Sequence, residues 1–190
     1  MMNPTERAEI DRLWQRKLVQ DAKSLAQSER HRNLEPDSAE FLNALACGLK
    51  PRFILEIGGS SGLSTIALAS AARQVKGTLV SIEIDARRQA EARATMQRLG
   101  LDRYVDFRNS DAVEVLPSLP GMNLVLIDCE KDDYIRFFDM LKLRAGTIVV
   151  ADNILSHNLT DYVRHVRSRG LESVTLPVGK GLELSRVPEK

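Results

Sequence analysis

Three oxygen-bearing side chains directly follow two short apolar runs in the second half of the chain. Asp128 ends the run over residues 124–128, and Asp152 and Asn153 follow the run over residues 147–151. Two carboxylates and an amide oxygen are hard ligands of the kind that Mg²⁺ or a similar divalent cation prefers. If the runs are parallel strands, these residues lie at the carboxyl ends where ligands bind. The alternative is that Asp128 and Asn153 cap the helices that follow them.

Lys131 is a candidate general base beside that group. It lies three residues after Asp128, at the start of an expected helix. A lysine next to a divalent cation has its neutral form favoured, and a neutral amine can accept a proton. The spacing therefore predicts that Lys131 faces the same opening as the cation.

A glycine-rich turn, FILEIGGSSGLS, predicts a cofactor site at the end of the first strand. Glu56, Gly58 and Gly59 stand where the strand turns into a helix, so backbone N–H groups can approach a ligand. The spacing is not that of a dinucleotide fingerprint, because Ser60 occupies a glycine position. Glu83 ends the second strand, where a carboxylate can bind both ribose hydroxyls. The pattern favours S-adenosylmethionine, and the alternative is an ordinary turn with a surface glutamate.

Apolar runs and helical periods alternate after residue 51, and this alternation predicts the fold that positions these residues. Strands are expected at 53–57, 78–84, 104–108, 124–128 and 147–151, and helices at 63–73, 86–99, 111–116, 131–141 and 158–169. Buried strands separated by helices indicate βαβ units and a mainly parallel sheet. The last two runs, 173–176 and 182–187, are joined by PVGKG and predict an antiparallel hairpin. We expect an α/β, doubly wound sheet of seven strands with this hairpin at its edge.

The N-terminal segment predicts helices and a loop rather than strands. Residues 5–27 read as an amphipathic helix, residues 28–37 as a loop and residues 37–48 as a second helix. The apolar face of the first helix is expected to comprise Ile10, Leu13, Trp14, Leu18, Ala22 and Leu25. We treat residues 1–190 as one domain, with 1–30 as its N-terminal amphipathic helix and loop.

The composition excludes several classes of protein. The chain has 190 residues, with 27 Lys and Arg against 26 Asp and Glu, and this balance argues against extended contact with nucleic acid. No apolar run approaches the length of a membrane span, and the N-terminus lacks the apolar stretch of a signal peptide. Two cysteines, Cys47 and Cys129, cannot form a disulfide framework. We therefore expect a cytoplasmic protein with reduced thiols and no membrane partner.

These motifs in this order resemble the cation-dependent small-molecule O-methyltransferases, of the catechol and caffeoyl-coenzyme A type. The resemblance extends from about His31 to Val187 and rests on LEIGGSSGLST, SIEID, DCEKDDY, ADN and LPVGKGLELS. It implies a Rossmann-like methyltransferase fold and a role for each matching residue. Those implied to bind the cofactor are Leu34, Glu56, Gly58, Gly59, Ser64, Glu83, Asp111, Ala112 and Asp128. The implied metal ligands are Asp128, Asp152 and Asn153, and the implied base is Lys131.

The resemblance implies methyl transfer from S-adenosylmethionine to a hydroxyl of a small molecule, leaving S-adenosylhomocysteine (SAH). The chain departs from the family at Cys129-Glu130, has no long insertion after Asn153 and contains only 5% aromatic residues, so no aromatic catechol slot is evident. One alternative methyl acceptor is hydroxylated uridine in transfer RNA. Its phosphates would be contacted by Arg30, His31 and Arg32 and by Arg164, Arg167 and Arg169. A further alternative function is that of a non-catalytic S-adenosylmethionine-binding protein. Relatives often form homodimers, and the helix that carries Trp14 is a candidate interface.

Overall fold

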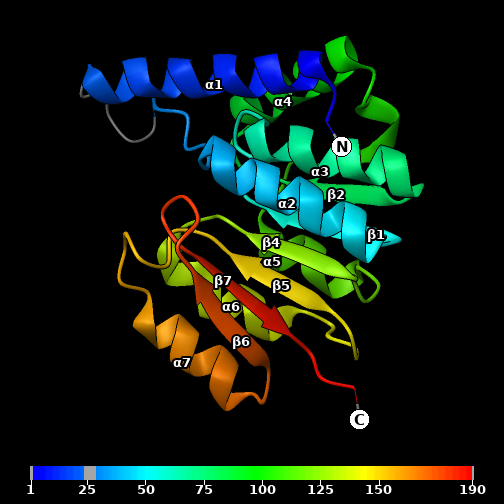
Figure 1. Ribbon diagram of the computed structural model, residues 1–190, viewed down its shortest axis with the longest axis vertical. Coiled ribbons are helices and arrows are strands. Elements are labelled where there is room, and N and C mark those ends of the chain that lie inside the picture. Colours follow the sequence, from blue (N-terminus) through cyan, green and yellow to red (C-terminus); the bar gives the residue numbers. More distant parts are fainter. Residues whose placement is uncertain (1, 24–28, 190) are drawn as a thin grey trace.

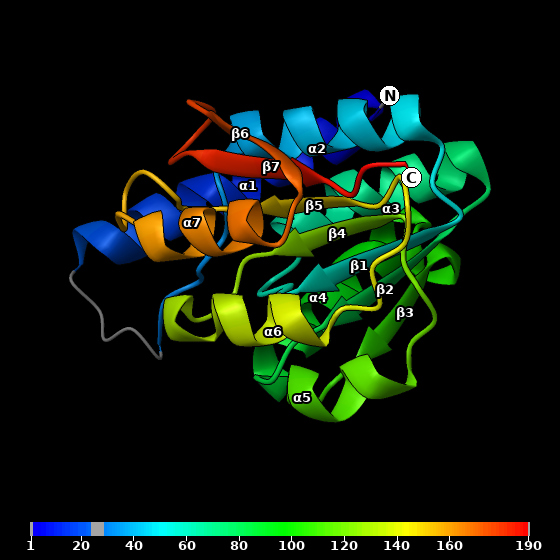
Figure 2. The ribbon, with the colours of Figure 1, turned by 90° about the horizontal axis from the view of Figure 1, so that it is seen from below.

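The protein is built around a seven-stranded sheet with helices on both faces, as Figures 1 and 2 show. The computed structural model describes residues 2–23 and 29–189. The strands are β1 (Phe53–Ile57), β2 (Thr78–Ile82), β3 (Val105–Arg108), β4 (Leu124–Ile127), β5 (Ile148–Ala151), β6 (Glu172–Leu176) and β7 (Leu182–Arg186). Their order is β3-β2-β1-β4-β5-β7-β6. The first five are parallel, and β7 is antiparallel to β5 and β6, which confirms the predicted fold class.

The helices form one layer on each face of the sheet. On one face lie α1 (Pro4–Ala22), α2 (Pro36–Leu49), α3 (Leu63–Val75) and α4 (Ala86–Leu99). On the other lie α5 (Ala112–Val115), α6 (Tyr134–Met140) and α7 (Thr160–Ser168). Single 3₁₀ turns cover Asp102–Tyr104, Leu116–Ser118 and Lys131–Asp133. The sheet is thus covered on both sides, as its apolar strands require.

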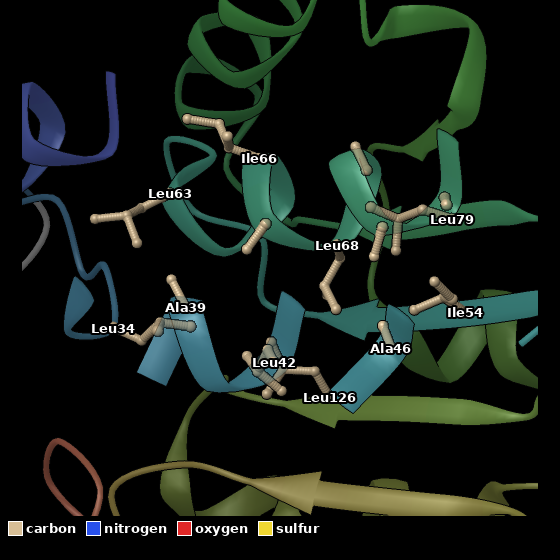
Figure 3. Packing of buried hydrophobic residues seen from close by; sticks show 14 of the residues in the cluster. Leu34, Ala39, Leu42, Ala46, Ile54, Leu63, Ile66, Leu68, Leu79 and Leu126 are labelled. Atoms are coloured by element: carbon tan, nitrogen blue, oxygen red, sulfur yellow. The ribbon is translucent and has the colours of Figure 1, made fainter. Parts of the chain in front are cut away.

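Successive strand residues alternate between these two layers. In β1, Ile54 packs toward α2 and α3 while Leu55 packs toward the opposite helices. Figure 3 shows Leu42 and Ala46 of α2 close to Ile54 and Leu126, with Leu68 of α3 above them. The central strands are therefore apolar runs, interrupted in β1 by Glu56, and this is why the sequence located them well.

α1 is held to the body of the protein by its N-terminal turn. Glu6 is fully buried, accepts a hydrogen bond from Ser70 Oγ at 2.8 Å and pairs with Arg73 of α3 at 2.6 Å. Asn3 and Glu6 also cap the helix through reciprocal side-chain-to-backbone bonds. This end is therefore fixed by charge and hydrogen bonds as well as by the buried Ile10 and Leu13.

The predicted apolar face of α1 is wrong over its second half. Leu18 is 41% exposed and Ala22 is exposed, whereas Lys17 is only 8% exposed; Leu25 lies outside the described residues. Figure 1 shows that α1 extends past α3, so α3 does not lie beneath its C-terminal part. Lys17, which occupies the inward-facing position in this part of the helix, lines a polar cleft instead of the core. Residues 24–27 of the predicted helix also lie outside the described residues.

Candidate active site

Two clefts open at the carboxyl ends of the parallel strands. The sheet reverses its order between β1 and β4, so the turns after these strands diverge and leave space between them. The first cleft, of about 690 Å³, is lined by residues that follow β1, β2, β3 and β4. The second, of about 760 Å³, lies between α1, the segment before α2 and the turns after β4 and β5. Arg32 and Asp128 line both clefts, so the two adjoin.

The glycine-rich turn is shaped by the protein around it. Gly58 has a φ of +96°, and a Cβ there would lie 2.1 Å from the carbonyl oxygen of Asp128. A Cβ at Gly59 would lie 2.5 Å from Ser81 Oγ and 2.9 Å from Glu56 Oε2. These glycines therefore let the turn after β1 lie directly against the end of β4 and the buried Glu56 carboxylate. Gly58 also lines the first cleft.

Glu83 is fixed at the wall of the first cleft. It is 7% exposed, and its two oxygens accept hydrogen bonds from the backbone N–H groups of Ser60 and Asp85, both at 2.8 Å. Asp111 and Ala112 line the same cleft. Asp111 also caps α5 by accepting from Val113 N at 2.9 Å. The first cleft therefore has a rigid carboxylate on one side and the start of a short helix on another.

Four of the predicted cofactor residues are buried and do not line this cleft: Leu34, Glu56, Gly59 and Ser64. Glu56 is fully buried, and its Oε2 accepts from Thr65 Oγ1 at 2.7 Å and Ser81 Oγ at 2.5 Å. Burial raises the pKa of Glu56, and a hydrogen bond from Ser64 opposes that shift. Among the residues that the structure describes, the other oxygen, Oε1, has no hydrogen-bond partner. Leu34 is 2% exposed, with its side chain in the apolar cluster of Figure 3.

Asp128, Asp152 and Asn153 are brought together after β4 and β5. The Asn153 amide nitrogen donates to Asp128 Oδ1 at 3.0 Å and to Asp152 Oδ2 at 2.8 Å. Asn153 has a φ of +64°, a conformation that asparagine tolerates better than most residues. Burial and the neighbouring Asp128 raise the pKa of Asp152 to about 8, and burial raises that of Asp128. Two carboxyl groups are thus held at one point, with Lys131 beside Asp128 as a compensating charge.

This donor set fits a divalent cation. Asp152 Oδ1 is buried and has no hydrogen-bond partner within residues 2–23 and 29–189. A bound cation would satisfy that oxygen and offset the mutual repulsion of the two carboxylates. In the same described ranges, no group of three His, Cys, Asp or Glu side chains is placed to hold a metal ion. In this structure the Asn153 amide nitrogen faces both carboxylates, so its neutral oxygen would join them as a ligand only after the side-chain amide is turned, with water or acceptor oxygens completing the shell.

Lys131 projects from a 3₁₀ turn into the second cleft. Its Nζ donates to Tyr134 Oη at 2.8 Å and to the carbonyl oxygen of Cys129 at 3.1 Å, and lies 3.3 Å from Asp128 Oδ1. Tyr134 Oη in turn donates to the carbonyl oxygen of Asp152 at 3.2 Å. Burial, followed by the charge of Asp128, raises the pKa of Tyr134 well above its usual value, so the phenol stays neutral. Lys131 is therefore positioned beside both carboxylate-bearing turns.

The second cleft also contains residues that the sequence reading did not predict as site residues. They are Lys17, Asp21, Asn33, His157 and Lys180. Lys17 and Asp21 come from α1. In the sequence they form an oppositely charged pair at i, i+4, a pattern that is usual on any solvent-facing helix and does not indicate a site. Lys180 lies in the C-terminal hairpin turn, far along the chain. The one sequence clue was that Lys17 falls seven residues after Ile10, on the buried face.

The segment 30–33 forms the wall between the two clefts. Its backbone is held at three successive residues: Arg30 O accepts from Arg88, His31 N donates to Gln20, and Arg32 N donates to Ser60 Oγ. Arg30 pairs with Asp21 at 3.3 Å, and Arg32 pairs with Glu130. The other arginines considered for nucleic acid, Arg164, Arg167 and Arg169, pair with Asp161, Glu183 and Asp139. They come from α7 and the residue after it, at a distance in sequence from the 30–33 wall.

A doubly wound sheet with a cleft at its switch point and acidic strand ends defines a Rossmann-like nucleotide- or cofactor-binding protein. A model of the O-methyltransferase family matches residues 14–166, and the chain belongs to that family. This covers most of the elements that line the two clefts.

Curated relatives resemble the chain in sequence, and solved structures resemble it in fold. The catechol O-methyltransferase of Niastella koreensis is 34% identical over 130 residues, which are 65% of this chain and 58% of that protein. The catechol O-methyltransferase of Mycobacterium tuberculosis is 34% identical over 120 residues, 61% of this chain and 54% of that protein. The chain thus spans a little over half the length of these relatives. The SAH-bound Podospora anserina methyltransferase PaMTH1 superposes with a TM-score of 0.81 at 20% identity, covering 98% of this chain and 89% of that one.

Within the described part of the chain, no helix is long and apolar enough to cross a membrane.

Proposed function

We propose that this chain transfers a methyl group from S-adenosylmethionine to a hydroxyl oxygen of a small molecule of the catechol or vicinal-diol type, assisted by a divalent cation. The observation that carries the proposal is the position of Asp128. It lines both clefts and lies 3.3 Å from Lys131, so a donor in one cleft and an acceptor in the other would meet beside it. Membership of the O-methyltransferase family gives the reaction class.

The first cleft suits the methyl donor. Glu83 offers a carboxylate, already held by two backbone N–H groups, to the ribose hydroxyls. Ala112 and the 71% exposed Ile84 supply apolar surface for the adenine. At the other end, Asp128 and the turn at Gly58 would face the methionine part, with Glu56, Ser64 and Leu34 supporting that turn from behind. The solved structure of PaMTH1 with SAH supports this cofactor for the fold.

The second cleft suits the acceptor. Asp128, Asp152 and Asn153 would hold the cation, which when bound lowers the pKa of an acceptor hydroxyl and orients two neighbouring oxygens. Lys131, in its neutral form, would take the hydroxyl proton at Nζ. The acceptor oxygen then forms a bond to the methyl carbon as the carbon–sulfur bond breaks. The products are a methyl ether and SAH, and much of the acceleration would come from holding the two reactants in line.

The test is incubation with methyl-labelled S-adenosylmethionine, Mg²⁺ and a vicinal-diol acceptor such as 3,4-dihydroxybenzoate or its amide. We expect a labelled methyl ether and an equal amount of SAH. Cofactor binding without transfer to any diol would favour a non-catalytic S-adenosylmethionine-binding protein. Transfer of label to bulk transfer RNA would instead favour the hydroxylated-uridine alternative. A small molecule is better supported, because Arg164, Arg167 and Arg169 pair with carboxylates and line neither cleft.

A further inference from the structure

The second cleft carries more positive charge than the proposed transfer reaction needs. Its described lining residues include only two carboxylates, Asp21 and Asp128. Against them stand five cationic side chains, those of Lys17, Arg30, Arg32, Lys131 and Lys180. No phenylalanine, tyrosine or tryptophan occurs among the lining residues that the structure describes. The cleft is therefore polar and basic, which a neutral aromatic diol alone does not explain.

The excess charge is located at the end of α1. Lys17 Nζ lies 2.6 Å from Asp21 Oδ2, and Arg30 lies 3.3 Å from Asp21 Oδ1. Two cations thus share one carboxylate. The other three cations each have an acidic partner of their own: Arg32 has Glu130, Lys131 has Asp128 and Lys180 has Glu35. Lys17 and Arg30 are consequently the pair with one positive charge left over.

Lys17 is the buried member of this pair, whereas the Arg30 side chain is 36% exposed and its backbone is held in place. Lys17 is 8% exposed, with its ammonium 4.8 Å from the ring centre of Trp14. The backbone of the 30–33 segment is tied to α1 through Gln20 and to α4 through Arg88. Two donors held in place in this way lose little freedom on binding an anion. A lysine is almost never buried unless it has a partner to bind.

We propose that the second cleft selects acceptors that carry an anionic group, a carboxylate or a phosphate, beside their vicinal hydroxyls, and that Lys17 and Arg30 bind that group. This inference rests on the proposed function, because it places the hydroxyls at Lys131 and Asp128. Asp21 then orients the two cations and competes with the bound anion. A small acid fits this position better than RNA, because Lys17 lines the cleft and is only 8% exposed.

The test compares binding of matched compounds by calorimetry, with the full chain loaded with SAH and Mg²⁺. The probes are 3,4-dihydroxybenzoate, 3,4-dihydroxybenzyl phosphate and the neutral 3,4-dihydroxybenzamide, which has nearly the shape of the benzoate. We expect the better anion to bind about tenfold or more tightly than the amide, since hydrogen bonds to charged groups are the strong ones. The ratio of the affinities for the benzoate and the benzyl phosphate identifies whether a carboxylate or a phosphate is favoured. The preference should shrink at high salt.

Three substitutions locate the effect. Lys17→Met keeps the apolar stem and should reduce the preference for the anion to near unity without changing binding of the amide. Asp21→Asn removes the competing carboxylate and should tighten binding of the anion several-fold. Loss of structure alone would weaken binding, so this increase in affinity is diagnostic. Lys23→Met changes an exposed lysine of the same helix end and should leave every probe unchanged.

The outcomes distinguish failure of the proposed anion site from failure of the proposed methyl transfer. Equal binding of acid and amide overturns the inference, and so does a Lys17→Met variant that weakens both alike; methylation of the amide would still support the proposed function. A preference for the acid that Lys17→Met abolishes supports the inference as a statement about binding. If that preference occurs without methyl transfer to any diol, the proposed function fails and the anion site remains.

Discussion

The Nζ of Lys131 lies 2.8 Å from the phenol oxygen of Tyr134, which itself bonds to the backbone carbonyl of Asp152. The proposed base is thus connected to the turn after β5 through one buried ring. Its other neighbours, Asp128 and Cys129 O, belong to the turn after β4. The amine is therefore positioned relative to both halves of the proposed cation site, and the first two predictions test that arrangement.

Replacing Lys131 with Met should lower kcat by roughly 10²–10⁴-fold, the usual contribution of a positioned general base. The substitution keeps the apolar stem and removes the proton acceptor. Binding of S-adenosylmethionine, measured by calorimetry, should change little. Lys76→Met, an exposed lysine at the end of α3, is the control and should keep the parental rate. Parental turnover in Lys131→Met would mean that the cation alone ionises the hydroxyl.

Tyr134→Phe tests whether the phenol positions the amine. The ring stays in its buried contact with Tyr162, so the fold should be retained, but Lys131 loses its nearest oxygen. We expect a fall in kcat of about tenfold with KM for the acceptor nearly unchanged, because alignment and not affinity is lost. A rise in KM with kcat preserved would contradict this positioning role.

Glu83→Ala should weaken S-adenosylmethionine binding by about 1.5–3 kcal/mol, the range for hydrogen bonds to a charged group. It also leaves the N–H groups of Ser60 and Asp85 without their acceptor. Glu114→Ala is a matched control, since Glu114 is an exposed acid whose side chain accepts a hydrogen bond from Ser110 near the same cleft. Calorimetry on both variants checks the prediction. Equal affinity in the parent and Glu83→Ala would refute the ribose assignment.

Removal of divalent cations with EDTA should abolish turnover on a vicinal-diol acceptor, and added Mg²⁺ should restore it. Binding can be measured independently of turnover, because a ligand that binds the folded state raises Tm with its concentration. Mg²⁺ should raise Tm in the parent and not in Asp152→Asn, which keeps the shape and loses the charge. Full activity after thorough chelation would leave these residues as structural side chains alone.

Gly58→Ala should destabilise the protein severely. The added Cβ would meet the Asp128 carbonyl oxygen at 2.1 Å, and the backbone would also be strained at a φ of +96°. Gly100→Ala separates the two causes, because Gly100 has a φ of +65° with nothing within 4 Å of its Cβ position. We expect about 1 kcal/mol for Gly100→Ala from the backbone alone. Urea unfolding should give a clearly larger loss for Gly58→Ala; similar losses would show that the turn can shift away.

The strands and their surroundings were predictable because their signal is local. A strand buried on both faces needs an apolar run; β4 and β5 are apolar throughout, and β1 is apolar except at Glu56. The polar residues after β4 and β5 could be placed at one edge by topology alone. The side-chain contacts that result, such as the bonds from Asn153 to both carboxylates, support the interpretation of Asp128 and Asp152 as a pair.

The second cleft could not be predicted in the same way. Its wall combines α1, residues 30–33 and the hairpin turn at Lys180, which are far apart in the chain and follow no shared period. Lys17 in particular looked like any charged residue on an amphipathic helix. Its burial depends on how far α1 extends past α3, and this is set by tertiary packing that periodicity does not report.

The two ends of α1 contact different parts of the protein. Glu6 at one end is bonded to α3, while Lys17 and Asp21 at the other end face the second cleft. The cleft for the methyl donor is built from the turns after the strands and receives no residue from this helix among those described. Exchanging Lys17 or Asp21 therefore alters the second cleft without replacing any described residue that lines the first. Proteins with the same donor side can in this way differ in the compounds they accept.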